Sequence, residues 1–255
     1  MSVKPPSGAA LYETLARVYD MSGQSRFSLR MVSYLLEIMA LRRLKPRKIV
    51  DLACGTGAAA VALARRRFEV TGVDGSQAML ARAHGRAERW KVAVDWRQMP
   101  LTALDLPGGY DMATCFYDSL NHLTEPEELR KAFYEVRRNL APGGLFFFDM
   151  NTRYALEKVW NQVTDAHVDE GYARIWKAAF DPATGLGRLD TTYFVREEGD
   201  LYRRVDATHH ARGYDPEAVA PILEEAGFTL LEAYECMTFD PVDSQTYRVA
   251  YLAQA

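Results

Sequence analysis

One stretch decides the fold of this chain: Ile49-Val50-Asp51-Leu52-Ala53-Cys54-Gly55-Thr56-Gly57. Its apolar half is typical of a buried strand, and the alanine-rich segment that starts at Ala58 has the composition of a helix. A strand, a glycine turn and a helix in succession are typical of α/β proteins, in which the turn brings the backbone close to a ligand. We therefore expect a parallel sheet that starts here and binds a ligand at its carboxyl edge.

The pattern on both sides of this stretch supports an α/β fold. Short apolar runs alternate with amphipathic segments, as in parallel strands joined by helical crossovers. The expected strands cover 48–53, 69–73, 92–95, 111–116 and 145–149, with helices that start near Ala58, Ser76 and Pro126. Helical patterns over 11–20 and 27–44 precede the sheet, and a helix over 216–226 and strands over 228–234 and 247–252 follow.

Residues 172–212 follow a different pattern. Three strand-like segments, 172–180, 188–196 and 201–212, are separated by turn residues. We expect an antiparallel β meander within an insertion at about 160–214, placed over the ligand-binding end of the sheet. The expected organisation is an N-terminal helical lid over 1–44 and one domain over 45–255 that carries this insertion.

Composition and charge disfavour several classes of protein. The chain of 255 residues has a net charge of -3, without the basic excess that holds nucleic acid. The longest dense apolar run, 144–150, is too short to span a bilayer, so we expect no membrane association. The cysteines, Cys54, Cys115 and Cys236, are widely separated and form no C-x-x-C pair. We expect a cytoplasmic protein with free thiols, as a monomer or homodimer.

Acidic residues are expected at the carboxyl ends of three successive strands, where open α/β sheets bind ligands. Asp51 lies four residues before Gly55, and a carboxylate there attracts a cation and repels a pyrophosphate. Asp74 could accept both hydroxyls of a ribose. Asp95 could accept the exocyclic amine of an adenine, with the backbone NH of Trp96 offered to a ring nitrogen. S-adenosylmethionine, which has an ammonium and a sulfonium but no phosphate, fits this pattern better than a dinucleotide does.

The chain resembles the class I S-adenosylmethionine-dependent methyltransferases, in particular their small-molecule branch. The motifs that carry the resemblance are Asp51-Leu-Ala-Cys-Gly-Thr-Gly57, Val73-Asp-Gly-Ser-x-x-Met-Leu80, Asp95-Trp96, Tyr110-Asp111 and Leu140-Ala-Pro-Gly-Gly144. The resemblance implies a Rossmann-like sheet of seven strands in the order 3-2-1-4-5-7-6, with strand 7 antiparallel. It also implies that S-adenosylmethionine is the cofactor and S-adenosylhomocysteine the product.

The resemblance assigns the glycine turn to the methionine part of the cofactor, Asp74 to the ribose and Asp95 to the adenine. Ala53 stands where the family usually has glycine, and Gly75 where a bulky apolar side chain is common, which implies weaker cofactor binding. The expected cofactor-binding residues are Tyr12, Tyr19, Asp51, Ala53, Cys54, Gly55, Gly57, Asp74, Gly75, Ser76, Met79, Asp95, Trp96 and Phe116.

Methyl transfer needs little from a protein beyond holding the acceptor in line with the sulfonium methyl group. A base is needed where a hydroxyl or ammonium must lose a proton, and His122 and then Asp118 are the candidates after the fourth strand. His122 could instead be a polar residue that closes a turn. His209 lies on the apolar face of its strand and is the third candidate. His210 faces the other way, so the two histidines cannot share a metal, and we expect no metal site.

Tyr12 and Tyr19 lie on one face of the first helix and could offer their rings to the sulfonium. The same stripe would also serve for helix packing alone. The leading interpretation is methyl transfer to a nitrogen, oxygen or carbon of a small-molecule acceptor. An RNA methyltransferase, a non-catalytic module that binds S-adenosylmethionine or S-adenosylhomocysteine, and a dehydrogenase remain as alternatives.

Overall fold

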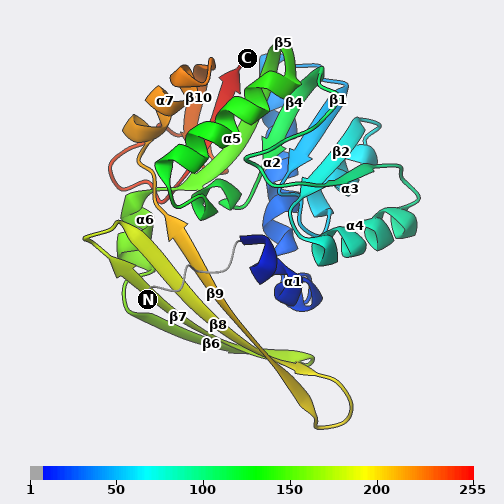
Figure 1. Ribbon diagram of the computed structural model, residues 1–255, viewed down its shortest axis with the longest axis vertical. Coiled ribbons are helices and arrows are strands. Elements are labelled where there is room, and N and C mark those ends of the chain that lie inside the picture. Colours follow the sequence, from blue (N-terminus) through cyan, green and yellow to red (C-terminus); the bar gives the residue numbers. More distant parts are fainter. Residues whose placement is uncertain (1–7) are drawn as a thin grey trace.

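The computed structural model describes residues 8–255, and its centre is a sheet in the order β10-β11-β5-β4-β1-β2-β3 (Figure 1). β1 to β5 are parallel, whereas β11 runs antiparallel to both β5 and β10. Counted in chain order within this sheet, the arrangement is 3-2-1-4-5-7-6, so the expected topology is confirmed. The strands are β1 (Lys48–Leu52), β2 (Glu69–Asp74), β3 (Asp95–Gln98), β4 (Tyr110–Cys115), β5 (Leu140–Asn151), β10 (Thr229–Glu235) and β11 (Arg248–Gln254).

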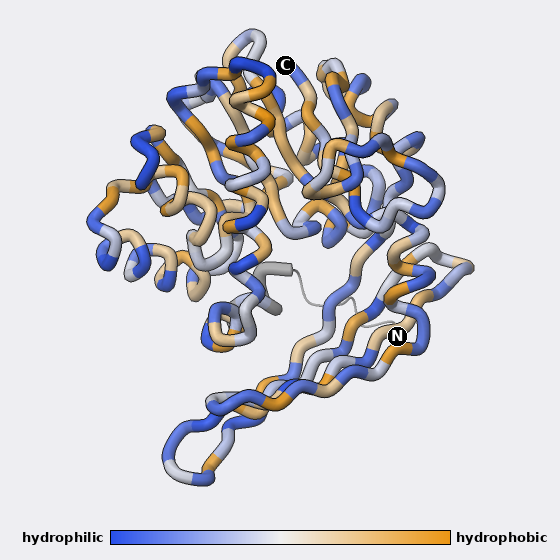
Figure 2. The backbone as a smooth tube through the Cα atoms, turned by 180° about the vertical axis from the view of Figure 1, so that it is seen from behind, coloured by the Kyte–Doolittle hydropathy of each residue, from blue (hydrophilic) through white to orange (hydrophobic). Residues whose placement is uncertain are grey.

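Helices cover both faces of this sheet. On one face Leu35 of α2 packs with Ile49, and on the other Phe133 of α5 and Leu223 of α7 pack with Phe146. Figure 2 shows the hydrophobic residues gathered in the strands between these helices. The helices are α2 (Ser25–Arg42), α3 (Ala58–Ala64), α4 (Gln77–Trp90), α5 (Pro126–Asn139), α6 (Arg153–Val159) and α7 (Pro216–Glu225). Within residues 8–255, none of the helices is long and apolar enough to cross a membrane.

A second sheet of four antiparallel strands projects from the main body beyond the carboxyl ends of the parallel strands (Figure 1). It comprises β6 (Val163–Val168), β7 (Tyr172–Asp181), β8 (Leu186–Arg196) and β9 (Tyr202–Arg212), and we call it the meander. The sequence pattern predicts its last three strands and misses β6. All residues of β6 are exposed, so this strand lacks the alternation of apolar and polar residues that reveals a half-buried strand.

The first helix, α1 (Gly8–Tyr19), lies between the meander and the main sheet (Figure 1). Leu15 and Val18 of α1 are fully buried against the inner face of the meander, where they meet Tyr193 and Val205. On its other side α1 contacts α4. The apolar stripe of α1 therefore serves packing, and its remaining side chains can face the carboxyl edge of the sheet.

The expected position of the third strand, 92–95, is wrong. Helix α4 continues to Trp90 and is closed by Lys91 in the left-handed region, so the next residues belong to the helix end. The strand starts at Asp95 and ends at Gln98, which pairs with Asp74. Asp95 therefore begins its strand instead of ending it, at the edge of the sheet away from Asp74.

Candidate cofactor and catalytic site

The glycine turn after β1 has backbone angles that few residues adopt. Ala53, Gly55 and Gly57 have φ values of 49°, 55° and 74°, all in the left-handed region. A side chain on Gly57 would place its Cβ 2.7 Å from Trp96 Cη2 and 2.8 Å from the Cβ of Ala83, so only glycine fits there. Ala53 adopts the conformation at a cost of roughly 1–2 kcal/mol. The turn thereby brings the backbone and the start of α3 to the carboxyl edge.

Asp74, at the end of β2, joins this turn to the next one. Its carboxylate accepts the backbone NH of Gly55 at 2.8 Å and that of Ser76 at 2.8 Å. The Ser76 hydroxyl caps α4 by accepting the NH of Met79 at 3.2 Å. Two strand ends that are 19 residues apart along the chain are therefore held together by one carboxylate.

Asp51 lies beneath the turn and is 2% exposed. Its Oδ1 accepts the Thr114 hydroxyl at 2.8 Å, while Oδ2 is buried without a hydrogen-bond partner among the described residues. Burial raises the pKa of Asp51 to about 7. A buried carboxylate oxygen that lacks a partner is costly, and a cation bound above the turn would compensate its charge.

Tyrosines of α1 meet histidines from two other elements at the same edge. The Tyr12 hydroxyl lies 3.1 Å from Nε2 of His122, which ends the 3₁₀ helix η1 (Ser119–His122). The ring of His209, on β9, has its centre 5.9 Å from that of Tyr12 and 5.8 Å from that of His122. Tyr19 approaches the glycine turn, with Cε1 4.0 Å from where a Cβ on Gly55 would lie. Burial raises the pKa of both Tyr12 and Tyr19, so both phenols stay protonated.

The hydrogen bonds of His122 define its tautomer. Nδ1 lies 3.1 Å from the backbone carbonyl of His210, which can only accept, so Nδ1 carries the proton. In the neutral ring Nε2 is then unprotonated and can accept a hydrogen bond from the Tyr12 hydroxyl. Burial, together with the smaller effects of His122 and His210, lowers the pKa of His209 to about 3, so its ring is neutral at pH 7. The site therefore contains an imidazole nitrogen able to accept a proton.

The loop after β4 is shaped by a buried ion cluster. Tyr117 and Asp118 are consecutive left-handed residues, with φ of 64° and 49°. Asp149 of β5, fully buried, accepts their backbone NH groups at 2.7 and 3.0 Å. Arg248 of β11 joins Asp149 at 2.5 Å and Asp118 at 2.9 Å, and its guanidinium lies 4.6 Å from the centre of the Phe27 ring. The Asp118 carboxylate is thus engaged by Arg248, which makes it a weaker candidate base than His122.

Comparison with known proteins identifies the family. The family described as "Methyltransferase domain" matches residues 49–144. A candidate methyltransferase of Geobacillus sp. (strain WCH70) is 34% identical over 208 residues, which cover 82% of this chain and 84% of the relative. The chain belongs to the class I S-adenosylmethionine-dependent methyltransferases. It is an enzyme of that family, and S-adenosylmethionine is its methyl donor.

Solved structures share the fold of this methyltransferase over nearly its whole length. An S-adenosylmethionine-dependent methyltransferase from Clostridium acetobutylicum superposes with a TM-score of 0.86 at 27% identity, over 95% of this chain and 98% of the other. An amino pentose methyltransferase from Micromonospora echinaspora, solved with S-adenosylmethionine bound, gives a TM-score of 0.74 at 21% identity, over 93% and 96%. Both superpositions cover more than nine-tenths of each chain.

The methyltransferase brings together most of the residues expected from the sequence. Asp51, Ala53, Cys54, the two turn glycines, Asp74, Gly75 and Ser76 lie at two adjoining strand ends, with Tyr12, Tyr19, Asp118, His122 and His209 around them. The unpartnered oxygen of Asp51, the glycine cradle and the strand-end carboxylate of Asp74 fit an ammonium-bearing nucleoside. These residues would hold the methionine and ribose parts of the cofactor.

Other expected residues lie elsewhere. The Asp95 carboxylate is about half exposed and pairs with Arg97 at 3.0 Å, at the amino end of β3. The Trp96 ring packs over Gly57 and Gly72, beside His84 of α4. Phe116 belongs to the hydrophobic cluster beneath α2. Asp95 and Trp96 are displaced because β3 starts three residues later than expected. Phe116 directly follows β4 and packs in the same cluster as Met112, on the α2 side of the sheet.

Sequence reasoning missed several residues of the site. Gln98 occupies the carboxyl end of β3 beside Asp74, and its Nε2 donates to the Gly75 carbonyl at 3.3 Å. The apolar residues just after it, Met99 and Leu101, were the signal that the strand continues beyond Asp95. Asp20, which accepts the Thr56 hydroxyl at 2.8 Å and pairs with Arg86 at 2.7 Å, and the Arg248 cluster gave no local signal.

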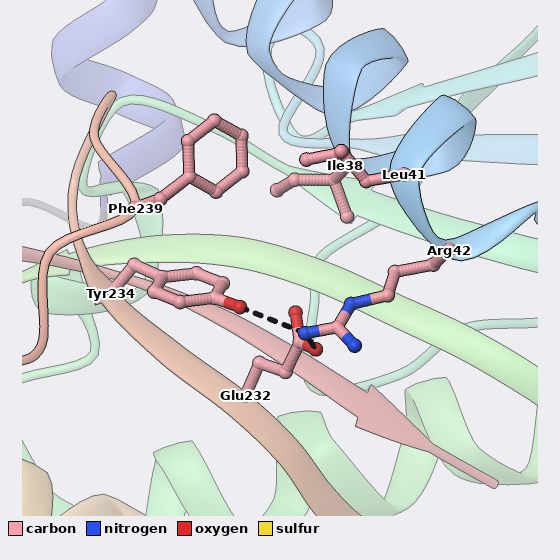
Figure 3. Close-up of a pocket in the computed structure, with 6 residues that line it drawn as sticks. All are labelled: Ile38, Leu41, Arg42, Glu232, Tyr234 and Phe239. Carbon is pink, nitrogen blue, oxygen red and sulfur yellow. Dashed lines mark hydrogen bonds and ion pairs between the residues drawn. The ribbon is translucent and has the colours of Figure 1, made fainter.

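A hollow of about 220 Å³ between α2 and β10 is separate from this site (Figure 3). Its polar groups satisfy one another, because Arg42 pairs with Glu232 and donates to the Tyr234 hydroxyl at 3.1 Å. Four strand spacings, about 19 Å, separate the edge strand β10 from β1. Arg42 also ends the helix that leads to the start of β1, at the opposite edge from the glycine turn.

Proposed function

We propose that this methyltransferase methylates a nitrogen or oxygen atom of a small-molecule acceptor, with His122 as the base that receives a proton through the Tyr12 hydroxyl. The observation that carries the proposal is the hydrogen bond from Tyr12 to the unprotonated Nε2 of His122, enclosed between α1, η1 and the meander. This pair lies at the edge where the glycine turn and Asp74 would hold the donor.

The enclosure supports a small acceptor. The Tyr12, Tyr19 and His209 side chains are half-buried where α1 packs against β9. A site covered in this way favours a compact acceptor over a polymer. The neighbouring arginines Arg42-Arg43 and Arg137-Arg138 could suggest RNA binding. Arg42 instead pairs with Glu232, and Arg137 donates to the Gly227 carbonyl. The amino pentose specificity named for the Micromonospora enzyme supports an amine among the possible acceptors.

The donor would be held by residues of three strand ends. Asp51 would compensate the ammonium, the backbone of the glycine turn would hold the methionine part, and Asp74 would accept the ribose hydroxyls. Gln98, instead of Asp95, would contact the adenine edge, because it ends β3 beside Asp74. In this proposal α1, within the expected lid segment over 1–44, acts as the lid, and the insertion at about 160–214 covers the acceptor.

The donor supplies an activated methyl group, and the chain supplies position and a proton acceptor. The carbonyl of His210 fixes the His122 ring with Nε2 facing Tyr12. The Tyr12 hydroxyl takes the proton from the acceptor's N–H or O–H while giving its own proton to Nε2. The acceptor's electron pair forms the bond to the methyl carbon, and the bond between that carbon and sulfur breaks. His122 ends as an imidazolium, and the sulfur would keep the bonding electrons, so that the donor's product would be S-adenosylhomocysteine.

The test combines binding with turnover. Calorimetry should give micromolar binding of S-adenosylhomocysteine and none of NADH, and methyl-labelled S-adenosylmethionine should label an acceptor in a metabolite pool. His122→Gln should bind S-adenosylhomocysteine within about threefold of the affinity of the unaltered protein, and it should label the acceptor at least about 100-fold more slowly. His167→Gln, on the exposed strand β6, is the matched control. Full labelling by His122→Gln would reject His122 as the base, and absence of nucleoside binding would reject the proposal.

A further inference from the structure

The inner face of the meander carries polar side chains as well as apolar ones. Because neighbours on a strand face opposite ways, Arg174 and Trp176 of β7 share one face. They pair directly with Tyr193 and Thr191 of β8. Thr191 pairs in turn with Ala207 of β9. Tyr193 and Ala207 pack in the cluster formed with α1, so this is the face turned toward the site.

Three side chains on this face have buried polar atoms without hydrogen-bond partners in the described part of the chain: Arg174 Nε, Trp176 Nε1 and Thr191 Oγ1. Thr191 is 3% exposed. The Arg174 guanidinium lies 3.6 Å from the centre of the Trp176 ring, and its Nη2 pairs with Asp165 at 3.2 Å. A buried polar group left without a hydrogen bond destabilises the folded chain. A ligand that presents lone pairs would satisfy these groups.

The strand register brings this patch beside the candidate catalytic residues. Ala207, opposite Thr191, lies two residues before His209, or about 7 Å along β9. His209 in turn lies beside His122. Burial raises the pKa of Tyr117, in the loop after β4, to about 12. The positive charge of Arg174 is close enough to lower that pKa. A molecule that spans the patch and His122 would therefore be of metabolite size.

We propose that Arg174, Trp176 and Thr191 bind an anionic oxygen group, a carboxylate or a phosphate, carried by the methyl acceptor. The inference rests on the proposed function and narrows its substrate class. The Arg174 and Trp176 NH groups can only donate, and the Thr191 hydroxyl can donate as well, so the ligand must present lone pairs. The guanidinium favours an anion over a neutral carbonyl, because a charged acceptor strengthens each hydrogen bond. The nucleophile would lie on the part of the acceptor that reaches His122.

The test titrates the whole protein, saturated with S-adenosylhomocysteine, with sodium phosphate and separately with sodium propionate. Ionic strength is held constant with chloride, and tryptophan fluorescence reports binding. One of the two anions should give a saturable change with a Kd near ~1 mM, as expected for a fragment of a substrate. Arg174→Met and Thr191→Val should each weaken that binding at least tenfold. Arg188→Met, which removes an exposed arginine on the outer face of β8, should leave it unchanged.

The outcomes separate the two proposals. Saturable phosphate binding identifies a phosphorylated acceptor, and saturable propionate binding identifies a carboxylate. Binding of neither anion by a protein that binds S-adenosylhomocysteine rejects the anionic subsite alone. Failure to bind S-adenosylhomocysteine rejects the proposed function instead. Thermal denaturation shows whether Arg174→Met is folded. If it is not, Thr191→Val tests the subsite, and unchanged anion affinity in that variant overturns the inference.

Discussion

At the scale of single residues, Asp51 has the most unusual chemistry in the site. Burial raises its pKa to about 7, so the folded protein holds a proton that the unfolded chain has released above pH 4. Between about pH 4 and pH 7 this residue therefore lowers stability as the pH rises. A ligand ammonium near Oδ2 would favour the charged carboxylate, which couples binding to loss of the proton.

We expect the affinity for S-adenosylhomocysteine to rise about tenfold between pH 5.5 and pH 7, because binding needs the deprotonated Asp51. Calorimetric titrations across this range give the measurement. Asp51→Asn has no titrating group at this position, and its weaker affinity should be nearly constant with pH. A pH-independent affinity in the unaltered protein would show that the ligand cation lies elsewhere.

At the scale of elements, the loop after β4 depends on β5 and β11. Asp149 holds two consecutive left-handed residues, and Arg248 compensates the buried charges of Asp149 and Asp118. Burial raises the pKa of Asp149, and the Arg248 charge opposes that rise. The loop beneath the proposed methyl-transfer position is thus shaped by contacts between three strands.

Arg248→Met should lower the free energy of unfolding by about 3–5 kcal/mol, because it leaves two carboxylates without their counter-ion. Urea denaturation followed by circular dichroism measures the change. The matched control is Arg130→Met on α5, which breaks exposed pairs with Glu127 and Glu225 and should cost less than about 1 kcal/mol. Equal losses of unfolding free energy in the two variants would mean that the buried cluster stabilises the fold no more than an exposed ion pair does.

At the scale of the whole molecule, α1 connects the meander to the main domain. Leu15 and Val18 fill the space against the meander, and the Gln24 side chain donates to the Tyr193 hydroxyl at 2.9 Å. At the other end of the contact, Asp20 is tied to the glycine turn through Thr56. The position of the meander and the shape of the cofactor site are therefore coupled through one short helix.

Leu15→Ala should destabilise this docking by about 2–5 kcal/mol, since the side chain is fully buried. We expect faster amide hydrogen exchange in α1 and β9, with unchanged exchange in β1 and β4, and weaker S-adenosylhomocysteine binding. Leu41→Ala, at a residue 65% exposed on α2, is the control. It should change neither the hydrogen exchange of α1 and β9 nor the affinity for S-adenosylhomocysteine. Retained protection of α1 in Leu15→Ala would contradict the proposed coupling.

The sequence by itself determined the α/β class, the order of the main elements, the glycine turn and the positions of Asp51 and Asp74 near the ends of their strands. These are local features, written in residue periodicity, turn chemistry and short spacings. It misplaced β3, because two valines at a helix end resemble a strand, and it missed β6, because an exposed strand has no apolar face. Resemblance to a family supplied the strand order, which local patterns do not contain.

Only the tertiary structure decided which distant residues meet. Arg248 reaches Asp149 and Asp118 across 99 and 130 positions of sequence, and Tyr12 reaches His122 across 110. The unsatisfied patch at Trp176 and Thr191 likewise exists only once β7 and β8 are in register. Such contacts depend on strand order, register and the docking of α1, which are set by packing of the whole chain and not by the residues adjacent in sequence.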